Sequence, residues 1–294
     1  MTLPGKIILA PMAGFTEMPF RILCEKYGAE ASLVPLVSAT GIANNTEYLK
    51  RIRISEKENA GFQMFGTIPD HFYSSAKLIQ DEMPSIKWID LNCGCPSPRT
   101  TAGGAGSKML KKPKLAAEIV SVLKKNDFLV SVKMRLLPEM EETLGFCKEI
   151  ENAGVDFITV HGRTKAQGYS GKADWKSIKH IHENVGIPVV GNGDIQTVDE
   201  GKQKVKEDYA DAFMIGRAAL SNPKLFNGGT VGSLGEAKEL LGEYLKICEE
   251  NDFSEQNNIR LVSIQFFRGF RGSSELRNRL ARAQNIEDIK VFIQ

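Results

Sequence analysis

Short apolar runs alternate with longer segments of helical period over the first 225 or so residues. Eight of the runs are rich in β-branched and aromatic residues, as buried strands are, and they cover residues 6–10, 31–37, 61–65, 88–92, 129–135, 156–161, 188–192 and 212–216. The segments between them have the period of amphipathic helices, and the clearest are 18–27, 68–82, 114–124, 141–152, 175–183 and 198–207. Eight such alternations predict an α/β fold, a parallel (β/α)8 TIM barrel, with an open doubly wound sheet as the alternative.

Two segments, 153–163 and 209–217, repeat one local pattern, and the repetition ends soon after the second. Each sets an acidic residue before an apolar strand and a glycine–arginine pair after it, as repeated βα units do. After residue 223 the strand rhythm stops, and the glycine-rich residues 228–235 are typical of a linker. The pattern therefore predicts a barrel domain over residues 1–227 and a small all-helical domain over residues 236–294.

Polar residues collect at the carboxyl ends of the predicted strands, where parallel barrels carry their chemistry. The fourth strand ends in Asn92, and the run Cys93-Gly94-Cys95-Pro96 follows at once, so an amide and a thiol arrive together. The glycine-rich loop that comes next is expected to be flexible enough to move the thiol over a ligand. The other strands carry, at or near their ends, Pro11, Met12, Ala13, Gln63, Lys133, Arg135, His161, Asn192, Gly193, Asp194, Gly216 and Arg217.

Two cations on the fifth predicted strand point to a bound anion. Lys133 and Arg135 are two residues apart, so both side chains face the same side of the strand. Because buried cations need nearby anions, we expect either an anionic ligand or pairing with Asp90 and Asp194. The glycines after the seventh and eighth strands, together with Arg217, suit a phosphate, whereas ordinary turns explain either glycine cluster taken alone.

The five cysteines are odd in number and irregularly spaced, which indicates free thiols rather than a disulfide framework. Cys93 and Cys95 form a Cys-x-Cys pair, but the other cysteines are scattered at apolar helix positions, so we expect no metal site. His161 at a strand end favours a functional histidine over a structural one. No run approaches the length of a membrane span and no secretory pattern is present, so we expect a cytoplasmic protein without membrane contact.

Composition adds little until the last sixty residues. The chain has 42% apolar and 25% charged residues and a net charge of +2, which is ordinary for a soluble protein. Residues 236–255 hold seven acidic residues against two lysines, whereas residues 260–282 hold six arginines against one glutamate. The arginine segment predicts either a phosphate-contacting face or a solvated pair of oppositely charged helices, and composition does not choose between them.

The motifs at the strand ends resemble, in order, those of tRNA dihydrouridine synthases. They are Ala10-Pro11-Met12-Ala13-Gly14-Phe15-Thr16, Phe62-Gln63-Met64-Phe65-Gly66, Asp90-Leu91-Asn92-Cys93-Gly94-Cys95-Pro96, Gly104-Ala105-Gly106, Val132-Lys133-Met134-Arg135, Val160-His161-Gly162-Arg163-Thr164, Gly191-Asn192-Gly193-Asp194-Ile195 and Ile215-Gly216-Arg217. The resemblance implies an FMN-binding catalytic barrel joined to a helical tRNA-binding domain, with NADPH as the reductant and tRNA as the partner. We expect a monomer.

The resemblance also assigns roles to individual residues. It implies Cys95, Lys133 and His161 as catalytic residues. FMN would contact Pro11, Met12, Ala13, Gln63, Lys133, His161, Asn192, Gly193, Asp194, Gly216 and Arg217. Substrate contacts are expected from Asn92, Arg135, Arg163, Arg99, Arg268 and Arg271, and the loop 97–108 is expected to close so that Arg99, Thr100 and Thr101 meet phosphates.

The chemistry implied by the resemblance accounts for these residue types. Hydride from the reduced flavin adds to C6 of a uridine, and C5 then takes a proton. A thiol with a pKa near ~8.5 is mostly protonated at neutral pH, so Cys95 suits the acid, while Lys133 stabilises the anionic reduced flavin. A stacked base has to be flipped out to reach the site. Rival interpretations are a flavin barrel for a free pyrimidine, such as a dihydroorotate dehydrogenase, and a barrel that binds tRNA without catalysis.

Overall fold

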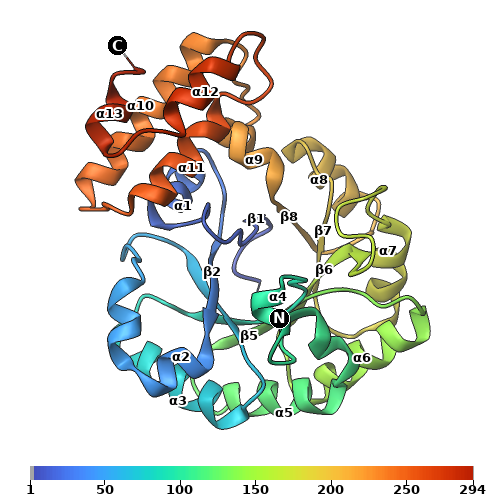
Figure 1. The fold of residues 1–294 in the computed structure, drawn as a ribbon. Coiled ribbons are helices and arrows are strands. Elements are labelled where there is room, and N and C mark those ends of the chain that lie inside the picture. Colours follow the sequence, from blue (N-terminus) through green and yellow to red (C-terminus); the bar gives the residue numbers. More distant parts are fainter. Residues whose placement is uncertain (1–2, 294) are drawn as a thin grey trace.

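Eight parallel strands form the centre of the molecule in the computed structural model, which describes residues 3–293. They are β1 (Ile7–Leu9), β2 (Ser32–Ser38), β3 (Ala60–Phe65), β4 (Trp88–Cys93), β5 (Leu129–Leu136), β6 (Phe157–Thr164), β7 (Val189–Asn192) and β8 (Ala212–Ile215). Their order is β1-β8-β7-β6-β5-β4-β3-β2, and an isolated parallel bridge joins Ile8 of β1 to Ala31, the residue just before β2. The predicted barrel is therefore confirmed, and the open doubly wound sheet is excluded (Figure 1).

Helices surround the barrel where the sequence predicts them, with ends that agree within one or two residues. The longer ones are α1 (Met18–Lys26), α3 (Pro69–Glu82), α5 (Pro113–Leu123), α6 (Met140–Asn152), α7 (Trp175–Asn184) and α8 (Val198–Lys206). Shorter segments are α2 (Ala39–Asn44), α4 (Pro98–Thr101), α9 (Arg217–Ser221), η1 (Thr46–Arg51), η2 (Gly106–Lys111) and η3 (Pro223–Asn227). Among the described helices, not one is both long and apolar enough to cross a membrane.

Four helices follow the barrel and pack against one side of it (Figure 1). They are α10 (Leu234–Glu250), α11 (Gln256–Phe266), α12 (Ser274–Leu280) and α13 (Ile286–Lys290). One hydrophobic cluster runs from the barrel side into these helices, and the rings of Phe20 in α1 and Phe266 in α11 stack with centroids 6.4 Å apart. The helices therefore share a core with the barrel, and α10 begins within the segment 228–235 that the sequence predicts as a linker. The exact domain boundaries stay a prediction.

The inside of the barrel is apolar at one end and polar at the other. Trp88 on β4 packs against Phe157 on β6, with ring centroids 5.5 Å apart, in a small interior cluster. Two residues further along β4 lies Asp90, and two further again lies Asn92, because side chains of a strand alternate between its faces. The interior thus becomes polar towards the carboxyl ends of the strands, which is where a site is expected in this fold.

Candidate active site at the carboxyl end of the barrel

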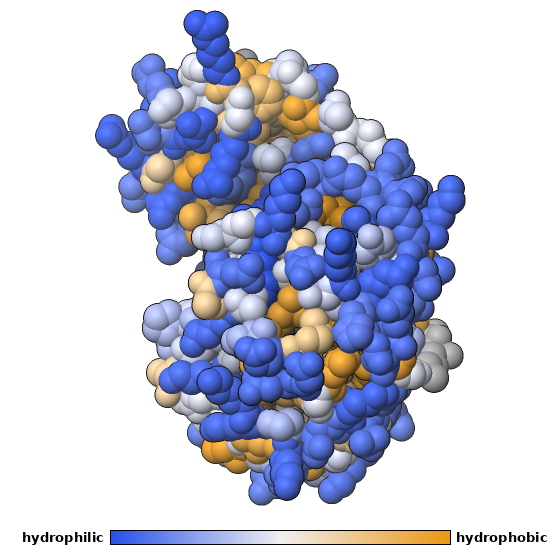
Figure 2. Space-filling model, turned by 90° about the vertical axis from the view of Figure 1, so that its right-hand side faces the viewer, coloured by the Kyte–Doolittle hydropathy of each residue, from blue (hydrophilic) through white to orange (hydrophobic). Residues whose placement is uncertain are grey.

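A cavity of about 580 Å³ lies at the carboxyl ends of the strands, a size suited to a small ligand. Its wall includes Gln265 of α11 as well as strand ends, so it lies between the barrel and the helical part. In Figure 2 the outline is indented on the left, between the helical part above and the barrel below. Of the predicted site residues it is lined by Pro11, Met12, Ala13, Gln63, Asn92, Cys95, Lys133, Arg135, His161, Asn192, Gly193, Asp194, Gly216, Arg217 and Arg268.

Cys95 is the one cysteine of the described residues that lines this cavity. Its backbone N–H donates to Asn92 Oδ1 at 2.9 Å, which fixes the start of the following loop. Cys93 instead lies fully buried in the hydrophobic cluster outside the strands, and burial raises the pKa of its thiol well above the ordinary value. Alternation turns Cys93 away from the face that carries Asn92, and β4 ends there. Cys95 lies in the loop that follows and reaches the cavity, so one thiol is accessible and the other is inert.

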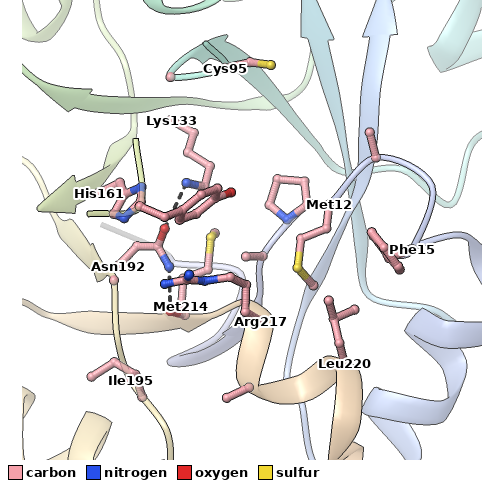
Figure 3. A pocket seen from close by; sticks show the side chains of 18 of the residues that line it. Met12, Phe15, Cys95, Lys133, His161, Asn192, Ile195, Met214, Arg217 and Leu220 are labelled. Atoms are coloured by element: carbon pink, nitrogen blue, oxygen red, sulfur yellow. Dashed lines mark hydrogen bonds between the residues drawn. The ribbon is translucent and has the colours of Figure 1, made fainter. Parts of the chain in front are cut away.

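Lys133 faces Cys95 across the same cavity. Its Nζ donates to Asn192 Oδ1 at 3.0 Å, and Asn192 Nδ2 donates to the carbonyl of Met214 at 2.8 Å. In Figure 3 Lys133, His161, Asn192 and Arg217 gather together, and Cys95 stands apart from them at the top of the view. Burial lowers the pKa of Lys133, while the nearby charge of Asp90 opposes that shift.

Arg135 does not need the anion that its position suggested. Its Nε donates to the carbonyl of Gly94 at 3.1 Å, and its Nη1 donates to the carbonyls of Thr164 at 3.1 Å and Gly168 at 2.8 Å. The alternative that Arg135 pairs with Asp194 is not found, because Asp194 is held by two other arginines. Three carbonyl oxygens can satisfy a buried guanidinium, and here they tie the loops after β4 and β6 together.

His161 is a neutral imidazole at physiological pH. Burial first, and then the charges of Lys133, Arg135, Arg163 and Arg217, lower its pKa to about 2. Arg163 Nη1 lies 3.3 Å from His161 Nε2, and since a guanidinium only donates, Nε2 is the acceptor and the ring hydrogen is on Nδ1. His161 can therefore donate or accept a hydrogen bond in the cavity without carrying charge.

Asp194 collects two arginines at the end of β7. Its Oδ2 accepts Arg163 Nη2 at 2.7 Å and the backbone N–H of Ala173 at 2.8 Å, and its Oδ1 accepts Arg217 Nη2 at 3.2 Å. Although burial alone raises the pKa of Asp194, these hydrogen bonds and charges outweigh it and lower the pKa below the ordinary value. Asp194 is thus ionised, and it holds Arg217 at the cavity with half of that side chain exposed.

Arg163 lies behind the cavity wall and does not line the cavity. Its side chain is 2% exposed, and it donates to the carbonyls of Ser170 at 3.2 Å and Gly171 at 2.6 Å as well as to Asp194. Four of its five N–H groups face Ser170, Gly171, Asp194 and His161, and the direct substrate contact that the sequence suggested stays a prediction. Arg163 supports the site by fixing the loop between β6 and α7.

The loop after Cys95 is folded into short helical segments. It forms α4 and η2, and the N–H of Ser107 donates to the carbonyl of Cys95 at 2.9 Å. Gly106 has φ +59, and a Cβ there would lie 2.6 Å from the same carbonyl oxygen, so the close approach requires glycine. Thr100 and Thr101 are buried, so contact with phosphates requires the loop closure that the sequence predicts, and it stays a prediction. Arg99 and Arg271 are exposed but lie outside the cavity wall.

Sequence patterns missed Tyr169 at the mouth of the cavity. The residue lies in the loop between β6 and α7 and is 61% exposed. Its ring centroid lies 4.3 Å from the guanidinium carbon of Arg217 and 5.6 Å from that of Arg135, which are favourable cation–π distances. A loop residue has no hydrophobic period to reveal it, and only the glycine-rich surroundings of Tyr169 hinted at a functional loop.

The model of the dihydrouridine synthase (Dus) family matches residues 8–286, which is nearly the whole chain. The chain belongs to the dihydrouridine synthase family. The resemblance of the strand-end motifs is thereby confirmed. As a dihydrouridine synthase the protein is an enzyme, and its family consists of flavin-dependent reductases.

Relatives of this dihydrouridine synthase cover most of its length. It is 33% identical to a probable tRNA-dihydrouridine synthase of Aquifex aeolicus over 97% of this chain and 94% of that protein. It is also 33% identical to tRNA-dihydrouridine synthase B of Pasteurella multocida over 92% of this chain and 80% of that protein. Among solved structures, histamine dehydrogenase from Rhizobium sp. 4-9 matches with a TM-score of 0.58 and 13% identity, over 83% of this chain and 49% of that chain. That likeness supports the barrel fold alone.

Proposed function

We propose that this protein is a tRNA-dihydrouridine synthase that uses FMN as its flavin and NADPH as its reductant to reduce the C5=C6 bond of specific uridines in tRNA. One observation carries the proposal beyond family membership. A single cavity sets the thiol of Cys95 opposite Lys133, His161 and Asn192, so a planar base has room between a proton donor and a cofactor. The names of the Aquifex and Pasteurella relatives support tRNA as the substrate.

The residues around the cavity fit FMN. The cavity volume of about 580 Å³ suits a flavin, and Met12, Met214 and Leu220 give it apolar surface. Gly193 has φ +125, and a Cβ there would lie 2.6 Å from the Cβ of Ala173, so only glycine fits and the backbone is exposed to the cavity at this point. Arg217 gives a partly exposed cation for the phosphate. Bound FMN supplies the hydride for the reaction.

The protein's own groups then have separable tasks. Lys133 would offer a positive charge and Gln63 a neutral amide to the bound flavin, and the charge would stabilise negative charge that builds up during reduction. Asn92 offers its amide to the edge of the flipped uracil. Cys95 donates a proton to C5 of the base, since its thiol is the one that reaches the cavity.

The proposed function predicts that the purified protein is yellow and reduces uridine in a tRNA transcript with NADPH. We expect free uridine at the same concentration to react at least about 100-fold more slowly, because remote contacts with the RNA contribute to the reaction barrier. The measurement is dihydrouridine formation by mass spectrometry. Equal rates on both substrates would favour a reductase of free pyrimidines, and a protein that cannot be reconstituted with FMN would favour RNA binding without catalysis.

The structure separates five of the six arginines of residues 260–282 into two groups. Arg260 and Arg277 donate to backbone carbonyls within the helical part, and Arg279 stacks on the ring of Phe292 with 5.0 Å to the centroid. Arg268 lines the cavity, and Arg271 is exposed close to it in the chain. We propose that Arg268 and Arg271 contact tRNA phosphates, whereas the first three arginines hold the helices together.

The variants Arg268→Glu and Arg271→Glu should each weaken tRNA binding and flatten its salt dependence. Each phosphate contact that is lost lowers the slope of log K against log salt by about 1, because fewer counterions are released. We expect Arg268→Glu to slow turnover as well, since that residue lines the cavity. A matched control is Lys50→Glu, an exposed cation of η1 on the connection that returns to the amino end of β3. Slopes as steep as that of the wild type would place the RNA elsewhere.

A further inference from the structure

A chain of buried hydrogen bonds crosses the barrel interior beneath the cavity and meets at Asp90. From one side, Trp88 Nε1 donates to Ser131 Oγ at 2.8 Å, and Ser131 Oγ donates to Asp90 Oδ1 at 2.5 Å. From the other side, Gln63 Nε2 donates to Asp90 Oδ2 at 2.8 Å. Asp90 is fully buried, so its two oxygens depend on these partners.

The second arm of this chain ends at the residue that carries the reacting thiol. Asn92 Nδ2 donates to Gln63 Oε1 at 3.0 Å, and Asn92 Oδ1 accepts the backbone N–H of Cys95 at 2.9 Å. Gln63, Asn92 and Cys95 all line the cavity. The arm therefore connects a carboxylate inside the barrel with the side chains that face the ligands.

The direction of these bonds requires a group that only accepts. The indole N–H of Trp88 and the backbone N–H of Cys95 are donors only, so both arms begin with a donor. The side chains between them are hydroxyl and amide groups, each of which accepts on one side and donates on the other. The donors of both arms thus point towards Asp90, and an ionised carboxylate is the side chain that can accept from both arms.

We propose that Asp90 is a positioning residue of the reaction, which holds the amides of Gln63 and Asn92 in one orientation and thereby fixes the backbone of Cys95. The proposal rests on the proposed function for its activity readout. Lys133 on the neighbouring strand balances the charge: burial raises the pKa of Asp90, while its hydrogen bonds and the charge of Lys133 oppose that shift. Asp90 has no place in the cavity wall, so it acts through Gln63 and not on the ligands.

An alternative role for Asp90 would be purely electrostatic, through its charge near Lys133 and Cys95. The variant Asp90→Asn removes the charge and keeps the shape, but an amide cannot accept from both arms at once. Both roles therefore predict slower uridine reduction in Asp90→Asn, by about 10- to 100-fold if a hydrogen bond to a charged group is lost. A double-mutant cycle with Gln63→Met separates them, because that variant breaks the arm and leaves the charge.

In the Gln63→Met background we expect Asp90→Asn to change the rate of uridine reduction by less than about twofold, because the arm through which it acts is already broken. The same factor in both backgrounds would overturn the positioning role, and so would an Asp90→Asn variant that is as active as the wild type. Thr159→Val is the matched control, since Thr159 is buried in the barrel with a hydroxyl that has no partner in the described chain. It should leave the rate within about twofold.

A second readout does not depend on the proposed function. Cys24, Cys93, Cys147 and Cys248 are buried, so iodoacetamide reports on Cys95 in the folded protein. We expect Asp90→Asn to raise the alkylation rate of Cys95 by about threefold or more, and to add less than about twofold in the Gln63→Met background. An equal rise in both backgrounds, or none, would contradict the proposal. A wild-type protein that fails to reduce tRNA uridine would defeat the proposed function, and alkylation would still test Asp90.

Discussion

Cys95→Ala should bind FMN and let NADPH reduce it at close to the wild-type rate, yet leave uridine in tRNA largely unreduced. We expect dihydrouridine formation to fall by about 100- to 10,000-fold, the range that a positioned general acid contributes. The thiol lies at the cavity wall opposite Lys133, and it is remote from Asn192 and Arg217 in Figure 3, so its removal should spare the flavin. Anaerobic mixing of the reduced protein with tRNA, followed by flavin reoxidation, measures the step directly.

Cys93→Ala is the matched control for this prediction. Cys93 stands two residues away, but its side chain is buried among apolar residues outside the barrel. Its truncation should lower the free energy of unfolding by about 1 kcal/mol through lost packing and leave the rate of uridine reduction within about twofold. A loss of activity in Cys93→Ala that equals the loss in Cys95→Ala would mean that the local fold matters, and not the thiol.

Lys133→Met should slow the reduction of the bound flavin by NADPH by about 100- to 1,000-fold, as the loss of one preorganised charge or donor does. Methionine has a similar length but gives no positive charge and no hydrogen bond to Asn192 Oδ1, which Lys133 contacts at 3.0 Å. The midpoint potential of the flavin should fall, because the reduced anionic ring loses its cation. Stopped-flow bleaching of the flavin absorbance and redox titration are the two measurements.

The control for this variant is Lys124→Met, which removes the same charge from the protein far from the cavity. Lys124 pairs with Asp156 at 2.6 Å before the start of β6, at the amino end of the barrel. We expect Lys124→Met to alter neither flavin reduction nor its potential. Since Lys133→Met also leaves buried Asp90 without its nearest cation, melting temperatures of both variants are needed, and a normal rate of flavin reduction in Lys133→Met would refute the assigned role.

Local patterns in the sequence sufficed for the scaffold and for the position of most cavity residues. A strand period of two and a helix period of 3.6 depend on near neighbours in the chain, and the closure rules of parallel barrels do the rest. The end of β4 shows the reach of this reasoning, since Asn92 and Cys95 arrive at the cavity as expected. Alternation turns Cys93 away from the cavity, but it would turn Cys95 the same way, and only the fold of the loop after β4 brings Cys95 to the cavity.

Hydrogen-bond and ion-pair partners that lie far apart in the chain could not be predicted from such local patterns. Arg163 and Asp194 are 31 residues apart, and their hydrogen bond holds Arg163 behind the cavity wall. Arg135 donates to three backbone carbonyl oxygens. Every residue has such an oxygen, so the residue types along the chain could not identify these partners. Thr100 and Thr101 are buried because their loop folds back onto the carbonyl of Cys95. Tyr169 was missed because it lies in a loop, where the sequence has no hydrophobic period.

The sequence by itself therefore determined the (β/α)8 barrel, the helical part that follows it, the family, and the strand ends at which chemistry can occur. Only the tertiary structure decided which cations are free and which are held, which of two close thiols is accessible, and that donors from two sides converge on Asp90. The physical reason is the range of the interactions. Periodicity records which face of an element is buried, whereas a hydrogen bond or an ion pair also depends on the element that faces it, and that is set only when the barrel closes.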